Sequence, residues 1–431
     1  MGDWFGTDGI RGIAGETITA RTAFALGNSL CRFKKNAVVL IGRDTRVSSD
    51  MLMLAAAAGI SAGGGTVYDG GILPTAAVSF FVRRIGADYG IVVSASHNPP
   101  EYNGLKVFDR NGMKLDEKDE GKIERYFGCY SFASALSCGK IFRLPHRGAY
   151  ADYIAQCCER PLSGFKFVLD CANGAASAFA PRIFEKLGAK VYCICCKTDG
   201  RSVNDHCGAL YPERVRDALL KYGADAGFSY DGDADRLIAV DERGEIVDGD
   251  KILYILAKDM KSKGRLPQNL AVGTAHTNTG VERALEREGV ALARTDIGDK
   301  YVARCMCRSG AAVGGEQSGH IILSRYASTG DGILTSVKLS ELITENKLSD
   351  LADVRLLPQY NASVKVRDKV RVLGSEKVRE AVERESGFVE RIVVRASGTE
   401  PVVRIFAEAE TMHAARSSAE RVRRIIIGSE E

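Results

Sequence analysis

Three aspartates alternate in the hexapeptide DGDADR, at Asp231, Asp233 and Asp235. Carboxylates held this close together repel one another unless a cation lies among them. Oxygen ligands of this kind are the ones that Mg²⁺ and Ca²⁺ prefer in proteins. The spacing therefore predicts a site for a divalent cation in the loop that follows the apolar strand GFSY.

Other kinds of site also use alternating aspartates. An EF-hand loop needs glycine at its sixth position, where Arg236 stands, and the apolar run LIAV follows at once, so an EF-hand is disfavoured. The aspartyl nucleophile of haloacid dehalogenases and the metal-binding D-x-D of nucleotide-sugar glycosyltransferases both remain open at this point. A solvated acidic turn is the weakest alternative, because three uncompensated acids are costly to hold together.

A second polar loop, SASHNP, places Ser96 and His97 at the end of the apolar strand GIVV. A serine hydrolase needs a base that approaches the serine from another segment, and the sequence contains no G-x-S-x-G. We therefore favour a serine that carries a phosphoryl group beside a metal ion. Lys106, ten residues farther on, suits a general base or an electrostatic partner, and a surface lysine is the alternative.

Two further loops carry groups that suit a phosphorylated sugar. Glu316 and Ser318 in GEQSGH offer a carboxylate and a hydroxyl to neighbouring sugar hydroxyls, although such a pair could equally cap a helix. The loop RASGTEP has the composition of a phosphate cradle, with a guanidinium, two hydroxyls and a glycine at Arg395, Ser397, Gly398 and Thr399.

An internal repeat indicates which elements position these loops. AVVLIGRDTR, FKFVLDCANG and NLAVGTAHTNTG each read as a strand and a polar loop, followed by helices at 51–61, 177–187 and 281–288. IGADYGIVVSASHNP and YGADAGFSYDGDADR then share Gly-Ala-Asp-x-Gly, a short strand and a polar loop, with SGAAVGGEQSGH as a looser third copy. The pattern predicts three similar α/β domains whose strand-end loops bind a ligand.

The end of the chain reads differently. Strands are expected at 362–366, 391–394 and 402–407, and helices at 375–385 and 413–427. This alternation predicts a small α+β domain that contains RASGTEP. We expect four domains, at residues 1–148 (phosphoserine loop), 149–247 (metal loop), 248–355 (sugar loop) and 356–431 (phosphate loop).

The bulk composition narrows the class of protein. The 431 residues, 45% hydrophobic and 26% charged, are typical of a globular protein with several domains. A net charge of +4 without a dense basic patch argues against nucleic acid as a partner. No apolar run approaches the ~20 residues of a membrane span, and the N-terminus does not resemble a secretory signal, so we expect no membrane and a cytoplasmic location.

The twelve cysteines are scattered along the chain. Cys157 and Cys158 are adjacent, as are Cys195 and Cys196, and adjacent cysteines suit neither an ordinary disulfide nor a zinc site. We expect reduced, mostly buried thiols.

The motifs FGTDGIRG, SASHNP, DGDADR, GEQSGH and RASGTEP occur in this order from Phe5 to beyond Arg404. This succession resembles the α-D-phosphohexomutase family. The resemblance implies an α/β fold of four domains around a central cleft: three homologous α/β domains with mixed sheets and a C-terminal α+β domain. The loop TAHTNTG departs from what is usual in bacterial relatives, where Met-Ser-Asn is common, and puts only sugar contacts in doubt.

The resemblance also implies a role for each site residue. Ser96 is the phosphorylated serine, and one of its phosphate oxygens completes the Mg²⁺ site of Asp231, Asp233 and Asp235. Lys106 is the general base, Arg11 lies near that phosphate, and His97 supports it or shapes the turn. The substrate-binding residues are Glu316, Ser318, His320, Arg236 and Lys300. The second phosphate is bound by Arg395, Ser397, Gly398, Thr399 and Arg404.

The implied reaction interconverts D-glucosamine 6-phosphate and D-glucosamine 1-phosphate, on the route to UDP-N-acetylglucosamine. One Mg²⁺ per chain and glucosamine or glucose 1,6-bisphosphate, as intermediate and activator, are the implied cofactors. Gln317 favours the amino sugar, because relatives acting on mannose and glucose phosphates usually have methionine there. Such a mutase is the nearest alternative, and the resemblance also suggests a homodimer. A metal-dependent phosphatase or a glycosyltransferase would not need Ser96, and the intact motifs argue against an inactive sugar-phosphate-binding relative.

Overall fold

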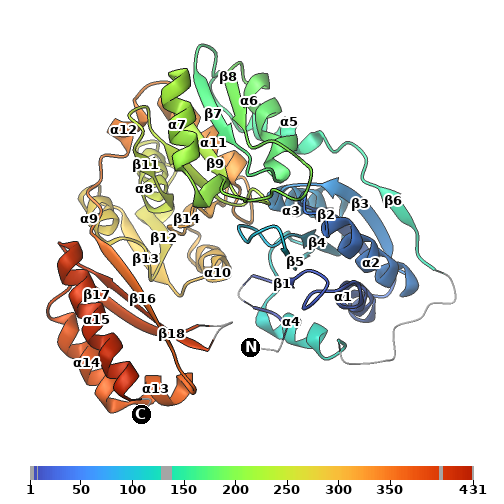
Figure 1. The fold of residues 1–431 in the computed structure, drawn as a ribbon. Coiled ribbons are helices and arrows are strands. Elements are labelled where there is room, and N and C mark those ends of the chain that lie inside the picture. Colours follow the sequence, from blue (N-terminus) through green and yellow to red (C-terminus); the bar gives the residue numbers. More distant parts are fainter. Residues whose placement is uncertain (1–3, 7, 128–137, 398–400, 430–431) are drawn as a thin grey trace. The chain divides into compact units, whose positions relative to one another are not determined.

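The computed structural model describes residues 4–6, 8–127, 138–397 and 401–429 (Figure 1). The chain divides into two compact units, each of which has its own core. The first unit comprises Met1–His276 and Gly289–Asp353, and the second comprises Thr277–Glu288 and Val354–Glu431. Three of the four sheets lie in the first unit, and the fourth lies in the second.

The three sheets of the first unit repeat one strand order, β5-β4-β2-β3, β10-β9-β7-β8 and β15-β14-β12-β13. In each sheet the last three strands are parallel and the first forms an antiparallel hairpin with its neighbour. The repeat and the mixed sheets expected from the sequence are thereby confirmed. Three site loops, SASHNP, DGDADR and GEQSGH, all lie in the turn of this hairpin.

The strands of the first unit have the following bounds. The first sheet contains β2 (Val38–Arg43), β3 (Thr66–Ile72), β4 (Tyr89–Val93) and β5 (Tyr102–Asp109), with β1 (Ile10–Ile13) and β6 (Ile141–Arg143) at its edges. The second contains β7 (Lys166–Asp170), β8 (Lys190–Ile194), β9 (Ala226–Tyr230) and β10 (Leu237–Val240), with β11 (Ile246–Val247) at one edge. The third contains β12 (Leu270–Thr274), β13 (Ala291–Thr295), β14 (Val313–Gly315) and β15 (Ile321–Leu323).

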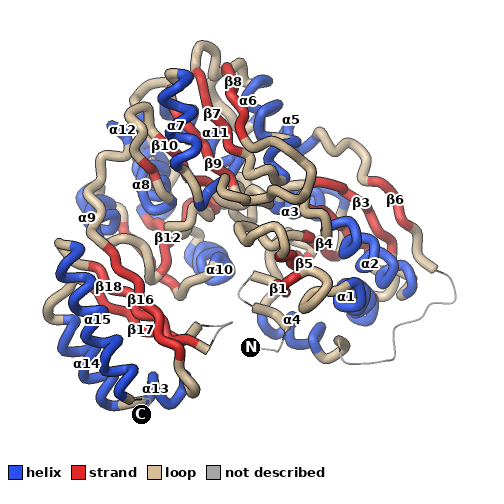
Figure 2. Tube along the Cα trace, viewed as in Figure 1, coloured by secondary structure: helices blue, strands red, loops and turns tan. Residues whose placement is uncertain are grey.

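Helices connect these strands (Figure 2). In the first unit they are α1 (Ala20–Phe33), α2 (Ser49–Ala62), α3 (Thr75–Ile85), α4 (Glu117–Glu124), α5 (Ala149–Gln156), α6 (Ala180–Lys186), α7 (Glu213–Tyr222), α8 (Gly249–Ser262), α10 (Asp299–Ser309), α11 (Gly332–Ile343) and α12 (Leu348–Leu351), with short 3₁₀ turns at Ala175–Ala178, Gly208–Leu210 and Pro267–Asn269. Among the helices of the described residues, no apolar stretch reaches the length that a bilayer crossing requires.

Close packing explains two helical glycines in the first domain. A Cβ atom on Gly27 of α1 would lie 2.2 Å from the carbonyl oxygen of Ala56, and one on Gly59 of α2 would lie 2.1 Å from that of Phe24. Only glycine permits this approach of the two backbones. The central strands are buried on both faces, which is why β4 reads as a continuous apolar run instead of an alternating one.

The helix expected at 177–187 is interrupted in the structure. A 3₁₀ turn ends at Ala178, Phe179 has non-helical dihedral angles, and α6 begins at Ala180. Pro181 stands in the first turn of α6, where its missing N–H costs nothing, whereas a proline within a continuous helix would remove one hydrogen bond. The sequence prediction of a single helix was therefore wrong at this point.

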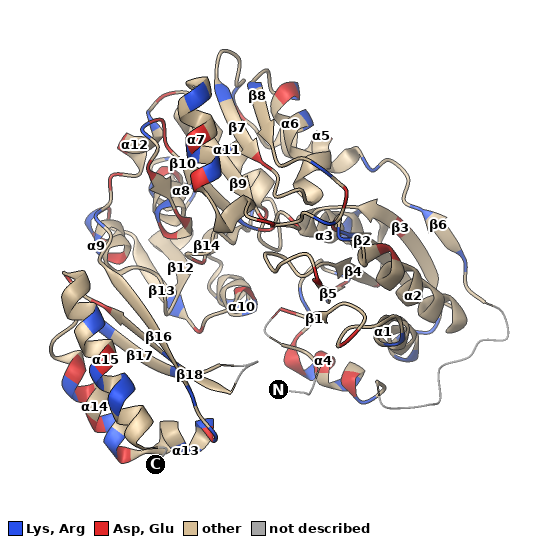
Figure 3. Cartoon of the chain, viewed as in Figure 1, with Lys and Arg blue, Asp and Glu red and all other residues tan. Residues whose placement is uncertain are grey.

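The second unit confirms the expected α+β pattern. Its antiparallel sheet has the order β16-β18-β17, with β16 (Gln359–Lys365), β17 (Arg391–Ala396) and β18 (Val402–Glu408). Its helices are α9 (Thr279–Arg287), α13 (Lys369–Gly374), α14 (Glu376–Ser386) and α15 (Met412–Gly428). Val403, Ala415 and Val422 belong to the buried core. Both signs of charge lie along α14 and α15 (Figure 3), as expected of solvated helix faces.

Candidate active site

Ser96 occupies a backbone conformation that is uncommon for any residue with a side chain. Its φ is 54°, and the residue is fully buried. Its N–H donates a hydrogen bond to Ser94 Oγ at 2.9 Å, and its hydroxyl donates to Asp231 Oδ2 at 2.6 Å. The left-handed turn thus directs the hydroxyl of the first hairpin loop toward the acidic loop of the second domain.

Arg46 holds the backbone of this turn. The guanidinium donates to the carbonyl oxygens of Ser96 at 3.0 Å, Asn98 at 2.7 Å and Tyr102 at 2.9 Å, and also to that of Pro99. Asp44 accepts from Arg46 Nε at 2.8 Å, and both side chains are buried. These contacts of Arg46, the Arg46 clamp, were not predicted from the sequence. The only available signal was a pair of opposite charges in the polar loop GRDTR of the first repeat.

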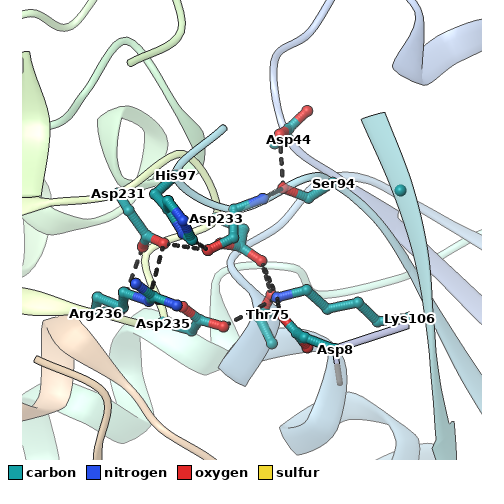
Figure 4. A network of polar contacts seen from close by, with 12 residues as sticks. Asp8, Asp44, Thr75, Ser94, His97, Lys106, Asp231, Asp233, Asp235 and Arg236 are labelled. Atoms are coloured by element: carbon teal, nitrogen blue, oxygen red, sulfur yellow. Dashed lines mark hydrogen bonds and ion pairs between the residues drawn. The ribbon is translucent and has the colours of Figure 1, made fainter. Parts of the chain in front are cut away.

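The three aspartates of DGDADR converge as predicted. One carboxylate oxygen of each lies within 4.8 Å of the others, and all three residues are buried (Figure 4). Asp233 Oδ1 and Asp235 Oδ1 have no hydrogen-bond partner among the described residues. Clustered, buried and unpartnered carboxylate oxygens are the donor set that Mg²⁺ takes in proteins, so these residues fit the ion.

Lys106 extends from β5 into the same cluster (Figure 4). Its Nζ lies 2.8 Å from Asp233 Oδ2, 3.0 Å from Asp235 Oδ2 and 3.1 Å from Asp8 Oδ2. Burial opposes the charged form, but Asp233, Asp235 and Asp8 outweigh it and raise the pKa of Lys106 well above its ordinary value. In this arrangement the lysine is an ammonium ion that holds the acidic loop. A role as a base would require these ion pairs to loosen first.

The acids of the cluster are not equivalent. Burial, together with the neighbouring Asp235 and Asp233, raises the pKa of Asp231 well above its ordinary range. Burial acts in the same direction on Asp235, but Lys106 and His320 outweigh it and lower the pKa of Asp235 well below that range. Asp231, which accepts from Ser96, is therefore the acid whose charge most needs a further cation.

His97 and Arg11 lie beside the serine loop. Nδ1 of His97 is 3.3 Å from Ser96 Oγ, and burial together with Arg236 and Arg11 lowers the pKa of His97 to about 3. The imidazole is therefore neutral and can only donate or accept one hydrogen bond at each nitrogen. Arg11 Nη1 donates to Asn98 Oδ1 at 3.5 Å and also pairs with Asp8.

The structure brings His320 of the third hairpin loop to the acidic cluster. Its Nδ1 lies 3.7 Å from Asp235 Oδ2 and its Nε2 lies 3.4 Å from Asp299 Oδ2. Burial opposes the charged form, but Asp299 and Asp235 outweigh it and raise the pKa of His320. His320 thus links the second loop to α10. In the same loop Glu316 accepts from the Gly298 N–H at 3.1 Å, burial and Asp299 raise the pKa of Glu316, and Ser318 is half-buried.

The two cationic residues expected at the substrate site have different surroundings. Arg236 Nε lies 3.9 Å from Asp231 Oδ2 and 4.0 Å from Asp235 Oδ1, within the acidic cluster. Lys300 Nζ instead lies 3.1 Å from Glu117 Oε1 and 3.8 Å from Glu120 Oε2, on α4. A pocket beside it is lined by Lys114, Lys300, Arg304 and His320 together with the carboxylate of Asp299. Lys114 pairs with Asp299, and Lys300 and Arg304 pair with Glu117, so an anion would have to compete with these carboxylates.

The second unit holds two arginines side by side. Arg395 of β17 and Arg404 of β18 face each other in the antiparallel register. Burial and the charge of Arg404 lower the pKa of Arg395, so an anion would stabilise the pair. Ser397 is buried, its N–H donates to Val402 O at 2.9 Å, and Lys369 Nζ donates to its carbonyl at 2.8 Å. Gly398 and Thr399, also expected to bind phosphate, lie outside the described residues.

Similarity to known proteins extends over nearly the whole chain. Four family models, described as the three alpha/beta/alpha domains and the C-terminal domain of phosphoglucomutase/phosphomannomutase, match residues 2–133, 148–244, 248–358 and 347–425. The phosphoglucosamine mutase of Desulforamulus reducens is 42% identical over an alignment of 441 positions, gaps included, which covers 99% of each chain. That of Pelotomaculum thermopropionicum is 43% identical over 428, which cover 96% of each.

Solved structures agree with these matches. The crystal structure of a phosphoglucomutase/phosphomannomutase family protein from Burkholderia thailandensis has a TM-score of 0.83 at 25% identity, over 98% of this chain and 97% of the other. The N-acetylphosphoglucosamine mutase of Aspergillus fumigatus, solved in complex with GlcNAc-6P and magnesium, has a TM-score of 0.71 at 18% identity, over 99% and 96%. The second likeness concerns the fold alone.

Proposed function

This chain belongs to the phosphoglucomutase/phosphomannomutase family, the α-D-phosphohexomutases, and on that premise we propose that it interconverts glucosamine 6-phosphate and glucosamine 1-phosphate. Full-length similarity to proteins named phosphoglucosamine mutase supports the amino sugar. The hydrogen bond of 2.6 Å from the Ser96 hydroxyl to Asp231, inside a cluster that fits a metal, carries the reaction type. The product would enter UDP-N-acetylglucosamine synthesis.

Ser96 is the proposed phosphoryl carrier. Its phosphoryl group passes to the free hydroxyl of the sugar phosphate, and the resulting 1,6-bisphosphate returns its other phosphoryl group to Ser96. Asp231, Asp233 and Asp235 would hold one Mg²⁺ per chain with an oxygen of the phosphorylated serine. When bound, the ion neutralises charge on the transferred group. Arg46 keeps the serine in its strained turn throughout, because its bonds are to backbone oxygens.

Four side chains of the serine loop and the acidic cluster have proposed roles in the transfer. Lys106 is the proposed general base, acting once substrate and metal compete for Asp233 and Asp235. Until then it stabilises the acidic loop electrostatically. Arg11 and Arg236 would stabilise negative charge on the phosphoryl group. His97 is proposed to donate or accept a single hydrogen bond beside it as a neutral ring.

The sugar and the second phosphate would be recognised by other loops. Glu316 and Ser318 would bind sugar hydroxyls, and His320 would position Asp235 beside them. Lys300 would contact the substrate only after exchanging its present contact with Glu117. The paired Arg395 and Arg404, with Ser397, Gly398 and Thr399, would bind the phosphate that is not being transferred, because two adjacent guanidinium groups favour an oxyanion.

The nearest alternative within the family is a mutase for glucose or mannose phosphates, with the same serine and metal. We also carry forward three proposals from the sequence: the domain boundaries 1–148, 149–247, 248–355 and 356–431, a homodimer, and a cytoplasmic location. Light scattering coupled to size-exclusion chromatography measures the oligomeric state directly. A monomer at assay concentrations would reject the dimer.

A mutase assay tests the proposed function. Glucosamine 6-phosphate, glucose 1-phosphate and mannose 1-phosphate are compared by kcat/KM with Mg²⁺ and a trace of the matching 1,6-bisphosphate. We expect a strong preference for the amino sugar and loss of nearly all turnover in Ser96→Ala. A preference for glucose or mannose phosphate would reject glucosamine phosphate as the substrate but would leave the proposed Ser96 mechanism intact. Full turnover by Ser96→Ala would reject the chemistry and favour a phosphatase or glycosyltransferase.

A further inference from the structure

Five cysteines gather near the carboxyl ends of β7 and β8: Cys171, Cys193, Cys195, Cys196 and Cys207. They form two groups. Cys196 interacts with Cys171 and Cys193, whereas Cys195 interacts with Cys207. The adjacent residues Cys195 and Cys196 therefore have different partners. The sequence predicted reduced, mostly buried thiols. The predicted burial is wrong for three of these five, because Cys193 is exposed and Cys195 and Cys196 are half-buried. The spacing of cysteines along the chain did not identify Cys207 as a neighbour of Cys195.

Cys195 combines strain, access and an activating environment. Its φ is 50°, a region that glycine occupies more readily, and the residue is half-buried. Arg214 Nη1 lies 3.5 Å from its Sγ, and an oxygen of Asp170 and Cys207 Sγ both lie within 4.8 Å. Cys207 is buried. The thiol of Cys195 is thus accessible to a small oxidant, whereas the thiol of Cys207 is buried beside it.

The proton distribution within the pair supports this asymmetry. The hydrogen bond from Cys207, helped by Arg214, lowers the pKa of Cys195 against burial and the charge of Asp170. The same hydrogen bond and burial raise the pKa of Cys207. A thiol of lowered pKa beside a thiol of raised pKa is the arrangement of a reactive cysteine and its resolving partner.

The segment between the two cysteines contacts the serine loop directly. Asn204, three residues before Cys207, donates from Nδ2 to the carbonyl oxygens of Ser96 at 2.7 Å and Asn98 at 2.9 Å. The N–H of Val47, next to Arg46, donates to Gly200 O at 3.3 Å. A change in the path of residues 196–206 would therefore reach the backbone that holds Ser96.

We propose that Cys195 and Cys207 form a peroxide-sensitive dithiol whose disulfide displaces Asn204 from the Ser96 loop. The Cys195 thiolate attacks hydrogen peroxide: an S–O bond forms, the O–O bond breaks, and hydroxide leaves to become water. Cys207 then attacks the sulfenic sulfur: an S–S bond forms, the S–O bond breaks, and the departing hydroxide takes the thiol proton as water. Two thiols and one peroxide give one disulfide and two waters, with the peroxide reduced.

The disulfide constrains the connecting segment. The two sulfur atoms must approach to about 2.05 Å with a fixed torsion, which draws Cys207 and the residues just before it toward β8. Asn204 has a left-handed backbone conformation with φ of 57°, and its N–H donates to Ala172 O at 3.0 Å. The backbone between Asn204 and Cys207 is therefore short and constrained, so a shift of Cys207 is transmitted to Asn204. The Ser96 carbonyl then keeps Arg46 but loses Asn204.

A thiolate-binding cation such as Zn²⁺ is the competing occupant of this group, because Asp170, Cys195 and Cys207 present three donors. The dithiol is favoured because these three residues offer at most three protein ligands, one fewer than the four of a structural zinc site. Asp170 is also held by backbone donors: Oδ1 accepts from the Ala172 N–H at 2.8 Å and Oδ2 accepts from the Gly208 N–H at 3.0 Å.

Peptide mapping by mass spectrometry tests the site. The reduced full-length protein is treated with hydrogen peroxide, blocked with a thiol reagent and digested. A Cys195–Cys207 link is expected in the parent chain and in the matched controls Cys193→Ser and Cys196→Ser, and dithiothreitol should reverse it. Links from Cys196 to Cys171 or Cys193, or oxidation of Cys195 without a link, would overturn the proposal. So would stoichiometric zinc in the reduced protein that must be removed before oxidation proceeds.

Cys195→Gly is the variant that cannot form the disulfide, because glycine suits the observed φ and removes the thiol without strain. Hydrogen exchange of peptides spanning 94–102 should rise on oxidation of the parent chain and stay constant in this variant. The effect on turnover rests on the proposed function: mutase activity of the parent should fall at least about tenfold and recover on reduction. A complete disulfide that changes neither exchange nor turnover would refute the coupling. If the protein lacks mutase activity, only the proposed function is rejected. Peptide mapping and hydrogen exchange still test the disulfide and its effect on the Ser96 loop.

Discussion

Replacing Arg46 by lysine tests whether the guanidinium holds the serine turn. Arg46 donates to four carbonyl oxygens and to Asp44 while being buried. Lysine keeps the charge near Asp44 but has three donors on one nitrogen, so it cannot reach carbonyls on both sides of the turn. We expect at least two charge-assisted hydrogen bonds to be lost. The carbonyls of Ser96 and Asn98 would retain Asn204.

The magnitude follows from these bonds. A hydrogen bond to a charged group contributes about 1.5–3 kcal/mol to stability. Because the carbonyls of Ser96 and Asn98 keep their hydrogen bonds from Asn204, we take the lower value for each lost bond. Two lost bonds then weaken the serine turn by about 3 kcal/mol. Ser96 holds a strained φ of 54° only while its surroundings impose it. A loss of this size changes the equilibrium constant between the ordered and the disordered turn about a hundredfold. We expect kcat/KM to fall by up to about a hundredfold, mostly in kcat.

Steady-state mutase kinetics and thermal unfolding measure the effect, with Arg43→Lys as the matched control. Arg43 is the last residue of β2, three positions before Arg46. Its Nη1 donates to Asp44 O at 3.0 Å, and its Nε pairs with the exposed Asp50 at 2.6 Å, an ion pair that contributes about 1 kcal/mol at most. The control should retain activity within about twofold. An Arg46→Lys enzyme that turns over as fast as the control would refute the clamp.

Three further outcomes are expected. Asp233→Asn should weaken Mg²⁺ binding at least about tenfold by isothermal titration calorimetry, because one charged oxygen ligand is lost; unchanged affinity would remove Asp233 from the site. Arg395→Gln should raise KM at least about tenfold with a smaller change in kcat, and an unchanged KM would reject the phosphate grip. Burial raises the pKa of Asp331 to about 6, so the native state holds a proton that the unfolded chain releases near pH 4, and stability falls between these values as pH rises. Asp331→Asn should therefore raise stability by up to about 3 kcal/mol above pH 6 and have little effect near pH 4; an equal gain in Tm at both pH values would contradict this.

The repeat architecture was accessible from the sequence because its signals are local. An apolar run such as GIVV or GFSY identifies a buried strand wherever it occurs, and the polar residues after it mark a strand end. The three copies therefore predicted three sheets, and the observed strand orders agree. The break between the 3₁₀ turn Ala175–Ala178 and α6 was not predicted, because it depends on the packing of Phe179 and on the position of Pro181 in the first turn of α6.

Within the site, the sequence by itself determined the chemical types: a hydroxyl at Ser96, three alternating carboxylates, and a guanidinium with two hydroxyls and a glycine in the loop of Arg395. Residue types and short spacings are properties of the chain and need no fold. Only the tertiary structure decided which groups meet. Ser96 and Asp231 are 135 positions apart, and Cys195 meets Cys207 instead of its neighbour Cys196. Such contacts arise from the packing of separate strands and loops, and no local pattern encodes the distance between them.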